Sequence, residues 1–355
     1  MKNFSELKAR RLGAQLLSGT PARSPEAVVE RLLAVQAQDA RGARLTVRSR
    51  STGLRAADLD DALTARRSMV ITWLNRGTLH LVGADDFWWL HPITTPQTVV
   101  TNRRRLHQEG VSDAQAKQGV DVVIEAVTSN GPQTRAELRA RLERARVPTA
   151  EQAFIHVLFA AALTGEVVRG PMRGSDNLFV STREWLGAPP PALDRSEALA
   201  RLARRYLAGH GPADARDLAR WAKLTLGDAR AALDGIRGDL TERADGLVDL
   251  ANRSTTPPPP PPPRLLGQFD PLLLGWVSRA PFVGTEGVVT NNGVFRPFAL
   301  VDGRVVAIWR LSGNTLTVQP LETLKAATVE ALRADASDVL RFLERPEAAE
   351  IVFEP

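Results

Sequence analysis

One local order of secondary structure recurs along the 355-residue chain: helical segments followed by a short pair of strands. In residues 113–190, three helical segments precede two strands placed around the turn sequence GPMRGSDN. Residues 191–256 repeat this order, and both segments carry a helix-ending Gly-Pro pair (131–132 and 211–212) before the second helix. This repetition predicts a tandem array of helix-turn-helix units, each with a strand pair as a wing.

The first 112 residues show the same order in a less regular form. Helices are predicted over residues 4–19 and 25–38, the second opening with an N-cap serine and a proline in SPEAVVERLLAV. The stretch RAADLDDALTARRSMVITW then favours a helix that runs into a strand, and NRGTLHLVG favours a second strand after a glycine turn. Helices followed by a short strand pair are typical of a winged helix, so residues 1–112 are expected to form the first of three such units.

The remainder of the chain differs in composition. Residues 257–263 are seven consecutive prolines, which predict a stiff linker of roughly 20 Å. In residues 264–355, hairpin turns are expected at NNG and VDGR between β-rich runs. A helix near 324–345 and a final strand in AEIVFEP complete a β-rich C-terminal subdomain. The predicted fold class is therefore α+β: tandem winged helices in 1–112, 113–190 and 191–256, followed by the linker and this subdomain.

The charge balance permits a polyanionic partner. The formal net charge is +6, and only five of the 46 basic residues are lysines, which leaves 41 arginines. Arginine suits bidentate contacts to phosphates and base edges. A general compositional bias explains the arginine excess equally well, since alanine is abundant too, so charge alone decides nothing.

Several classes of protein are disfavoured. The chain has no cysteine, and its five histidines (80, 91, 107, 156 and 210) show no metal-ligand spacing, so no metal and no cofactor are expected. No P-loop, dinucleotide-binding or nucleophile-elbow motif occurs. The N-terminal sequence lacks the apolar core of a signal peptide, and no apolar run approaches the roughly 20 residues of a membrane span. We expect a cytoplasmic protein with no membrane partner.

The stretch LLAVQAQDARGA, residues 32–43, holds two glutamines separated by one alanine. On a helix, positions two apart point in different directions. In an extended segment, they share a face. Gln36 and Gln38 are therefore either unrelated polar residues at a helix end, or the helix stops before them and both amides aim at one target.

Four stretches carry a resemblance that covers the chain from about residue 5 to 355. AVQAQDA, RGTLHLVGADDFWWLHP, QFDPLLLGWVSR and GVFRPFALVDGRVVAIWR together resemble the AlkZ/YcaQ-like family of winged-helix DNA glycosylases. The resemblance implies a C-shaped array of tandem winged helices that works without a metal. It also implies a monofunctional enzyme that excises N-alkylated purines and, in some members, unhooks interstrand crosslinks. The Gln-apolar-Gln signature of the family matches Gln36-Ala37-Gln38, which would make both glutamines catalytic.

Elementary chemistry explains why amides would suffice for this reaction. Removing an ordinary base requires protonation of the leaving group by an acid. A purine alkylated at N7 or N3 is already cationic, so the enzyme needs only to place a water against the sugar and tolerate an oxocarbenium-like transition state. A glutamine oxygen accepts a hydrogen bond from that water, and its NH2 can hold a phosphate or a base edge.

Further site residues follow from their positions beside these stretches. Asp39 can support catalysis by stabilising cationic sugar, or it can pair with Arg41 or Arg44. His80 can face the lesion pocket, or it can be a half-buried strand histidine. Phe269 and Asp270 are candidates for bordering the DNA channel. The DNA-binding candidates are Arg41, Arg44, Arg76, Thr78, Arg279 and Arg296, the last beside the tip of the TNNGVFRP hairpin.

The prediction is thus a monomeric enzyme acting on double-stranded DNA that contains alkylated purines. The alternative is a non-catalytic winged-helix transcription regulator, which would read sequence through base contacts and has no use for paired amides. A damage-sensing protein that binds lesions without releasing a base is a third reading.

Overall fold

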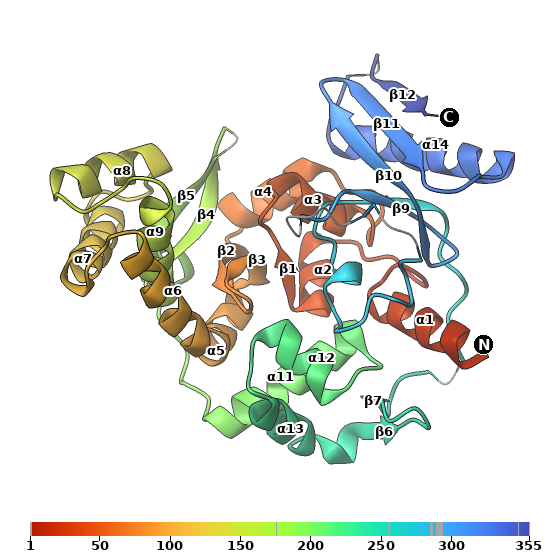
Figure 1. Cartoon of the computed structure of the whole chain (residues 1–355), viewed down its shortest axis with the longest axis horizontal. Coiled ribbons are helices and arrows are strands. Elements are labelled where there is room, and N and C mark those ends of the chain that lie inside the picture. The colour runs from red at the N-terminus through yellow and green to blue at the C-terminus, as the bar shows by residue number, and fades with distance from the viewer. Residues whose placement is uncertain are drawn as a thin grey trace.

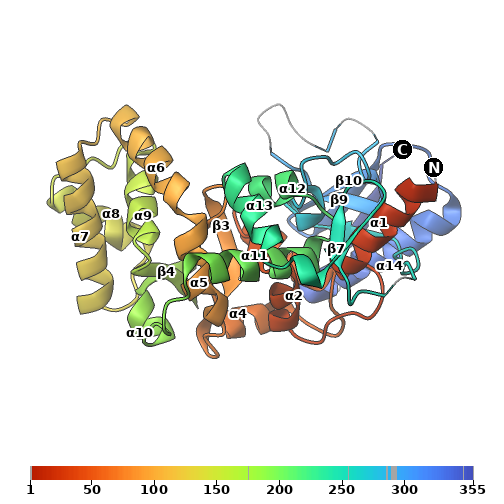
Figure 2. The same cartoon turned by 90° about the horizontal axis from the view of Figure 1, so that it is seen from below.

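A computed structural model describes residues 2–174, 176–254, 256–284, 287–288, 294–346 and 348–354. It shows a mixed α+β fold, which confirms the predicted class (Figure 1). Figures 1 and 2 both place helices α7–α9 at one end of the molecule and α14 at the other, with strands β1–β3 between them.

Three units repeat the same order: a helix, a short extended segment, two helices and a hairpin. The first is preceded by α1 (Lys2–Ala14) and followed by α5 (Ala84–Thr94) and α6 (Pro96–Gln108). It consists of α2 (Pro25–Leu32), β1 (Ala34–Gln36), α3 (Ala40–Arg48), α4 (Ala56–Thr64), β2 (Met69–Leu74) and β3 (Thr78–Gly83). Within this unit, β1 pairs antiparallel with the last strand, β3.

The second and third units have the same topology with a shorter extended segment. The second consists of α7 (Asp113–Ser129), α8 (Arg135–Arg144), α9 (Ala153–Leu163), β4 (Val167–Arg173) and β5 (Asp176–Ser181), and the short α10 (Thr182–Leu186) follows it. The third consists of α11 (Arg195–His210), α12 (Ala215–Ala222), α13 (Leu226–Asp234), the 3-10 turn Arg237–Asp239, β6 (Leu240–Glu242) and β7 (Val248–Leu250). In each of these two units, one isolated β-bridge to the last strand takes the place of β1. The bridge joins Gln133 to Phe179 in the second unit and Ala213 to Val248 in the third.

The strands of the first two units join into one sheet in the order β1-β3-β2-β4-β5. Because neighbouring residues of a strand point to opposite faces, this sheet separates two cores. Leu81 and Ile71 pack with α7 and α9 on one face. Val82 and Val70 pack on the other face with Tyr206 of α11. Gln36 and its cross-strand neighbour His80 share the face of Val82 and Val70, so they point toward the third unit.

The C-terminal part is a five-stranded sheet with one long helix. Its elements are β8 (Arg264–Leu266), the 3-10 turn Pro271–Leu273, β9 (Phe298–Val301), β10 (Arg304–Ser312), β11 (Thr315–Pro320), α14 (Ala326–Phe342) and β12 (Glu350–Phe353). The order is β12-β11-β10-β9-β8. The expected VDGR turn joins β9 to β10, with Asp302 and Gly303 at φ values of 48° and 70°. The NNG turn, residues 291–293, lies outside the described residues.

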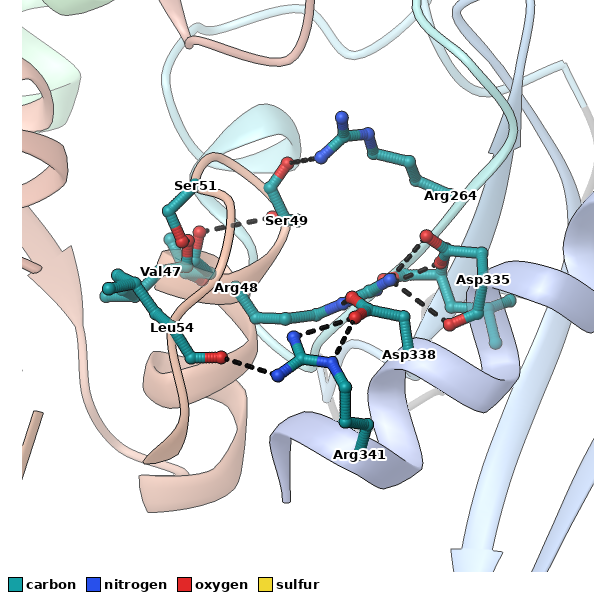
Figure 3. Close-up of polar contacts among 11 residues, drawn as sticks. Val47, Arg48, Ser49, Ser51, Leu54, Arg264, Asp335, Asp338 and Arg341 are labelled. Carbon is teal, nitrogen blue, oxygen red and sulfur yellow. Dashed lines mark hydrogen bonds and ion pairs between the residues drawn. The ribbon is translucent and has the colours of Figure 1, made fainter. Parts of the chain in front are cut away.

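Helix α3 ties the C-terminal part to the first unit. Arg48 reaches from α3 to Asp335 and Asp338 of α14, and its Nε lies 2.9 Å from Asp338 Oδ2 (Figure 3). Arg341 of α14 returns a bond to the Leu54 carbonyl at 3.1 Å. Because α3 begins directly after the two glutamines, these contacts fix the C-terminal part relative to the glutamine segment.

Two helix predictions are wrong at their ends. The helix predicted over 4–19 ends at Ala14, and the one predicted over 25–38 ends at Leu32. Leu33 has a φ of 65°, and the chain then enters β1. Pairing with β3 outweighs the helical preference of LLAVQAQ, because the backbone groups of a buried segment need partners wherever tertiary structure supplies them.

The polyproline segment packs on the protein. Residues 257–263 have no regular secondary structure, and Pro258 lies against α1, where a side chain on Gly13 would meet it at 2.7 Å. Within the described ranges, no helix combines the length and the apolar content needed to cross a bilayer.

Candidate active site

Gln36 and Gln38 lie where the chain leaves β1 and turns into α3. The backbone here is extended, and Ala37 N donates to the Leu79 carbonyl at 2.7 Å. Asp39 then caps α3 by accepting from Gly42 N at 2.5 Å. The helix therefore stops before the glutamines, which is what the second of the two alternatives requires of the backbone.

Both glutamine oxygens bond to the same stretch of β-hairpin. Gln36 Oε1 accepts from Arg76 Nη2 at 3.1 Å, in the turn between β2 and β3. Gln38 Oε1 accepts from Leu79 N at 3.3 Å. Because a guanidinium and a backbone N–H can only donate, the atom that faces them is the oxygen in each amide. Gln36 is buried, with 7% of its surface exposed, and Gln38 is exposed.

The NH2 groups of these two amides have no hydrogen-bond partner among the described residues. Gln133, in the extended segment of the second unit, makes the contrast clear. Its Nε2 donates to the carbonyls of residues 130–132 at 3.2–3.4 Å, and its Oε1 accepts from Arg141 Nε at 3.3 Å. Both ends of the Gln133 amide thus have hydrogen-bond partners within the fold. The NH2 groups of Gln36 and Gln38 are still able to donate to a ligand.

His80 lies opposite Gln36 across the β1–β3 ladder. Its Nδ1 is 2.8 Å from the Thr78 carbonyl, which only accepts, so Nδ1 carries the proton of a neutral ring. Burial, and secondly the nearby Arg76 cation, lower the pKa of His80 to about 3. His80 is therefore a neutral imidazole near pH 7, and it lacks the acidic second proton with which an imidazolium acts as a general acid.

Two threonines on this face have unused hydroxyls. Thr72 is opposite His80 on β2, and Thr78 begins β3. The Oγ1 atoms of both are buried and have no partner among the described residues. Buried hydroxyls without a partner are uncommon in a stable protein, and these two lie on the sheet face that Gln36 shares.

Three arginines from different parts of the fold influence one another near Gln36. Arg76 Nη1 donates to the Trp221 carbonyl of α12 at 3.1 Å. Burial, and secondly the charges of Arg220 and Arg279, lower the pKa of Arg76 to about 10. Arg279 Nε donates to the Leu273 carbonyl at 2.9 Å, and its guanidinium lies 4.8 Å from the ring centroid of Phe295. We call Arg76, Arg220 and Arg279 the arginine cluster.

The remaining candidates have their contacts elsewhere. The expected pairing of Asp39 with Arg41 or Arg44 is wrong, because Arg44 pairs with Asp60 and Arg41 donates to the Leu311 carbonyl at 3.1 Å. Both arginines thus bond within the fold. Arg296 is exposed, and its backbone N donates to Val288 O at 2.8 Å. Most of the hairpin tip that precedes it lies outside the described residues.

Asp270 is a structural residue rather than part of a channel. It is fully buried and forms a two-pronged ion pair with Arg50, at 2.7 and 2.8 Å. Arg220, by contrast, joins the site without being predicted. It belongs to no motif, and only the docking of α12 against the β2–β3 turn brings it there. In the described part of the chain, no group of three histidine, aspartate or glutamate side chains could hold a metal ion.

Three comparisons bear on this arrangement. A family model described as DNA glycosylase AlkZ-like matches residues 29–342. A protein of Streptomyces sahachiroi named interstrand DNA cross-link repair glycosylase is 28% identical over 383 aligned residues, which cover 96% of each protein. The solved structure of the Streptomyces sahachiroi DNA glycosylase AlkZ has 25% sequence identity and a TM-score of 0.75, and the match covers 99% of this chain and 98% of that one.

Proposed function

The chain belongs to the AlkZ-like family of DNA glycosylases, and from that premise we propose that it hydrolyses the N-glycosidic bond of cationic N7- or N3-alkylated purines in double-stranded DNA. The reaction is a direct attack by water positioned by Gln36 and Gln38. The protein acts as a monomer and without a cofactor.

The scaffold of this proposal is a set of three tandem winged helices in a C-shaped array around the duplex. Each unit has the order helix, extended segment, two helices and hairpin, with the extended segment paired to the last strand. This order is typical of a winged helix, in which two helices and a wing meet DNA. The first unit is distinguished by a longer extended segment, which carries both glutamines at its end.

The proposal rests on one observation: donors of the β2–β3 hairpin hold both glutamine oxygens, Arg76 in the turn and Leu79 in β3. A carbonyl oxygen has two lone pairs, so each oxygen can accept one further hydrogen bond, from the attacking water. The NH2 groups can then hold a DNA phosphate or a base edge. Two anchored amides fix the position and orientation of one water molecule, which is the proximity contribution to catalysis.

The chemistry limits the substrate. Glutamine is a negligible base, and neutral His80 offers no proton to the leaving group. Activity therefore requires a base that leaves without protonation, as a cationic alkylpurine does. None of the lysines (2, 8, 117, 223 and 325) lies beside Gln36 in the sequence to form a Schiff base, which favours a monofunctional glycosylase.

We extend the substrate range to bulky adducts and interstrand crosslinks. The support is the name of the Streptomyces relative, an interstrand DNA cross-link repair glycosylase, whose match covers nearly the whole chain. A C-shaped array that reads the lesion at the duplex surface can admit adducts that a tight base-flipping pocket excludes.

The experiment uses two duplexes that differ in one base. The protein is incubated with a duplex containing 7-methylguanine and, separately, with one containing hypoxanthine, which is a neutral lesion. Released base is measured by chromatography, and abasic sites by strand scission after alkali. We expect free 7-methylguanine and no hypoxanthine. Release of neither base, or of both at similar rates, would contradict the proposal.

Gln38→Ala separates the proposed enzyme from a transcription regulator. Loss of excision with unchanged DNA affinity supports the enzyme. Loss of sequence-specific binding, without any excision by the wild type, supports the regulator.

A further inference from the structure

We propose that the arginine cluster of Arg76, Arg220 and Arg279 is a binding site for a single DNA phosphate next to the lesion nucleotide. The inference rests on the proposed function for the nature of the ligand, a phosphodiester. Beyond that function, it assigns a phosphate site built from three separate parts of the fold. It also links this site to Gln36 through the hydrogen bond from Arg76.

The fold brings the three arginines together through α12. Arg76 bonds to the carbonyl of Trp221, the residue directly after Arg220. The segment of Arg279 is held on the same helix, because Val277 N donates at 2.8 Å to Asp217 Oδ1, one turn before Arg220. The β2–β3 turn thus contacts the last turn of α12, and the 277–279 segment contacts its first turn.

The cluster lacks a counter-charge. Among the described residues, none of its three guanidinium groups has a carboxylate within 4.0 Å, although most of the buried arginines elsewhere do. Arg48 and Arg50, for example, are each paired with an aspartate. The arginine cluster therefore holds mutual repulsion that a bound anion would relieve.

The shifts in pKa agree with this repulsion. Burial is the largest cause of the lowered pKa of Arg76, and like charges from Arg220 and Arg279 follow. The pKa of Arg279 is lowered by burial and then by Arg220. A group with a strongly shifted pKa, as Arg76 has, is characteristic of binding and catalytic positions.

The geometry of guanidinium groups suits a phosphodiester. A planar fork of N–H donors matches two phosphate oxygens at once. Arg76 is the connecting residue, because the guanidinium that would face the phosphate also holds Gln36 Oε1 at 3.1 Å. Binding of the backbone and alignment of the catalytic amide would then depend on one another.

The first test measures how salt weakens binding. Kd for a duplex with a tetrahydrofuran abasic analogue is measured by fluorescence anisotropy over a range of salt concentrations. Arg220→Gln and Arg279→Gln are compared with Arg345→Gln, an exposed arginine beyond α14 that gives the same change in charge. Because the three arginines share one phosphate, each cluster variant should lower the slope of log Kd against log salt by up to about 1, and the control should leave it unchanged. Equal slopes in all four proteins would overturn the site.

The second test locates the phosphate. Neutral methylphosphonates replace, one at a time, the phosphates on either side of the abasic analogue. At one position the replacement should weaken wild-type binding by about tenfold, the strength of one charge-assisted contact, and should weaken binding of Arg220→Gln by less than about twofold. An equal penalty in both proteins at every position would overturn the inference.

Neither test requires turnover, so the two proposals fail separately. If the wild type excises no 7-methylguanine but the cluster variants lower the salt slope, the phosphate site stands and the proposed function fails. If excision occurs but the slopes are equal, the site fails and the proposed function stands. Because Arg220 is exposed, we expect its substitution to leave the fold intact, which circular dichroism of the variant checks.

Discussion

Arg76 donates to Gln36 Oε1 and to the Trp221 carbonyl with the two ends of one guanidinium, at 3.1 Å each. The catalytic amide proposed here is thus oriented by a residue that is itself anchored to another unit. This arrangement turns the docking of the third unit into a determinant of the geometry around Gln36.

Arg76→Lys should keep the positive charge but lose the planar guanidinium that donates to both Gln36 Oε1 and the Trp221 carbonyl. An ammonium is a compact donor that does not span both acceptors in a fixed plane. We expect the single-turnover rate of 7-methylguanine release to fall by about tenfold, as for the loss of one oriented hydrogen bond, with the salt slope of binding unchanged. Arg345→Lys is the matched control. A variant that keeps the wild-type rate would show that Gln36 needs no such support.

The buried ion pair of Arg50 and Asp270 joins the first unit to the C-terminal part, and it should contribute strongly to the free energy of unfolding. Arg50→Met leaves the Asp270 carboxylate buried with no arginine, and we expect the free energy of unfolding to fall by about 3–5 kcal/mol. Arg310→Met, which breaks an exposed pair with Glu354, should cost less than about 1 kcal/mol. Urea unfolding measures both. Similar losses for the two variants would contradict the assignment.

His91 should make folding sensitive to mild acid. Burial lowers its pKa to about 4, and its Nε2 bonds to the Ala162 carbonyl at 3.1 Å. In the unfolded chain His91 binds a proton near pH 6.5, whereas in the folded chain it does so only near pH 4. The contribution of neutral His91 to the free energy of unfolding is therefore complete above pH 6.5 and is lost as the pH falls toward 4. Between pH 7.5 and 5.5 this residue alone should lower the free energy of unfolding by an amount on the order of 1 kcal/mol.

The measurement is the free energy of unfolding in urea at both pH values. His91→Gln keeps a donor for Ala162 and does not titrate, so its pH dependence should be smaller than that of the wild type by the stated amount. Identical pH dependence in the two proteins would refute the linkage.

Local pattern was sufficient to predict most of the repeating elements. The helices and hairpins of the second and third units have clear caps, turns and apolar periodicity, and α14 and β12 lie where their sequences indicate. Periodicity failed at LLAVQAQ, where the run continues a helical pattern but the chain forms β1. The deciding interaction is the ladder to β3, more than 40 residues away, and no local signal contains it.

The site shows the same division. Gln36 and Gln38 stand out by spacing and by resemblance, and His80 stands out by its strand. Arg220 does not, because the role proposed for it arises from the docking of α12 against a turn far away in the sequence. Asp270 is the opposite case. A carboxylate in an apolar stretch suggests a functional site, but the structure pairs it with the buried Arg50.

The most direct test of the central claim is the single-turnover rate of 7-methylguanine release by Gln38→Ala, measured beside its affinity for the same duplex. If anchored amides position the attacking water, the rate falls on the order of 100-fold while Kd stays within about twofold of the wild type. A rate equal to that of the wild type, at equal affinity, would show that Gln38 serves only to complete the end of β1.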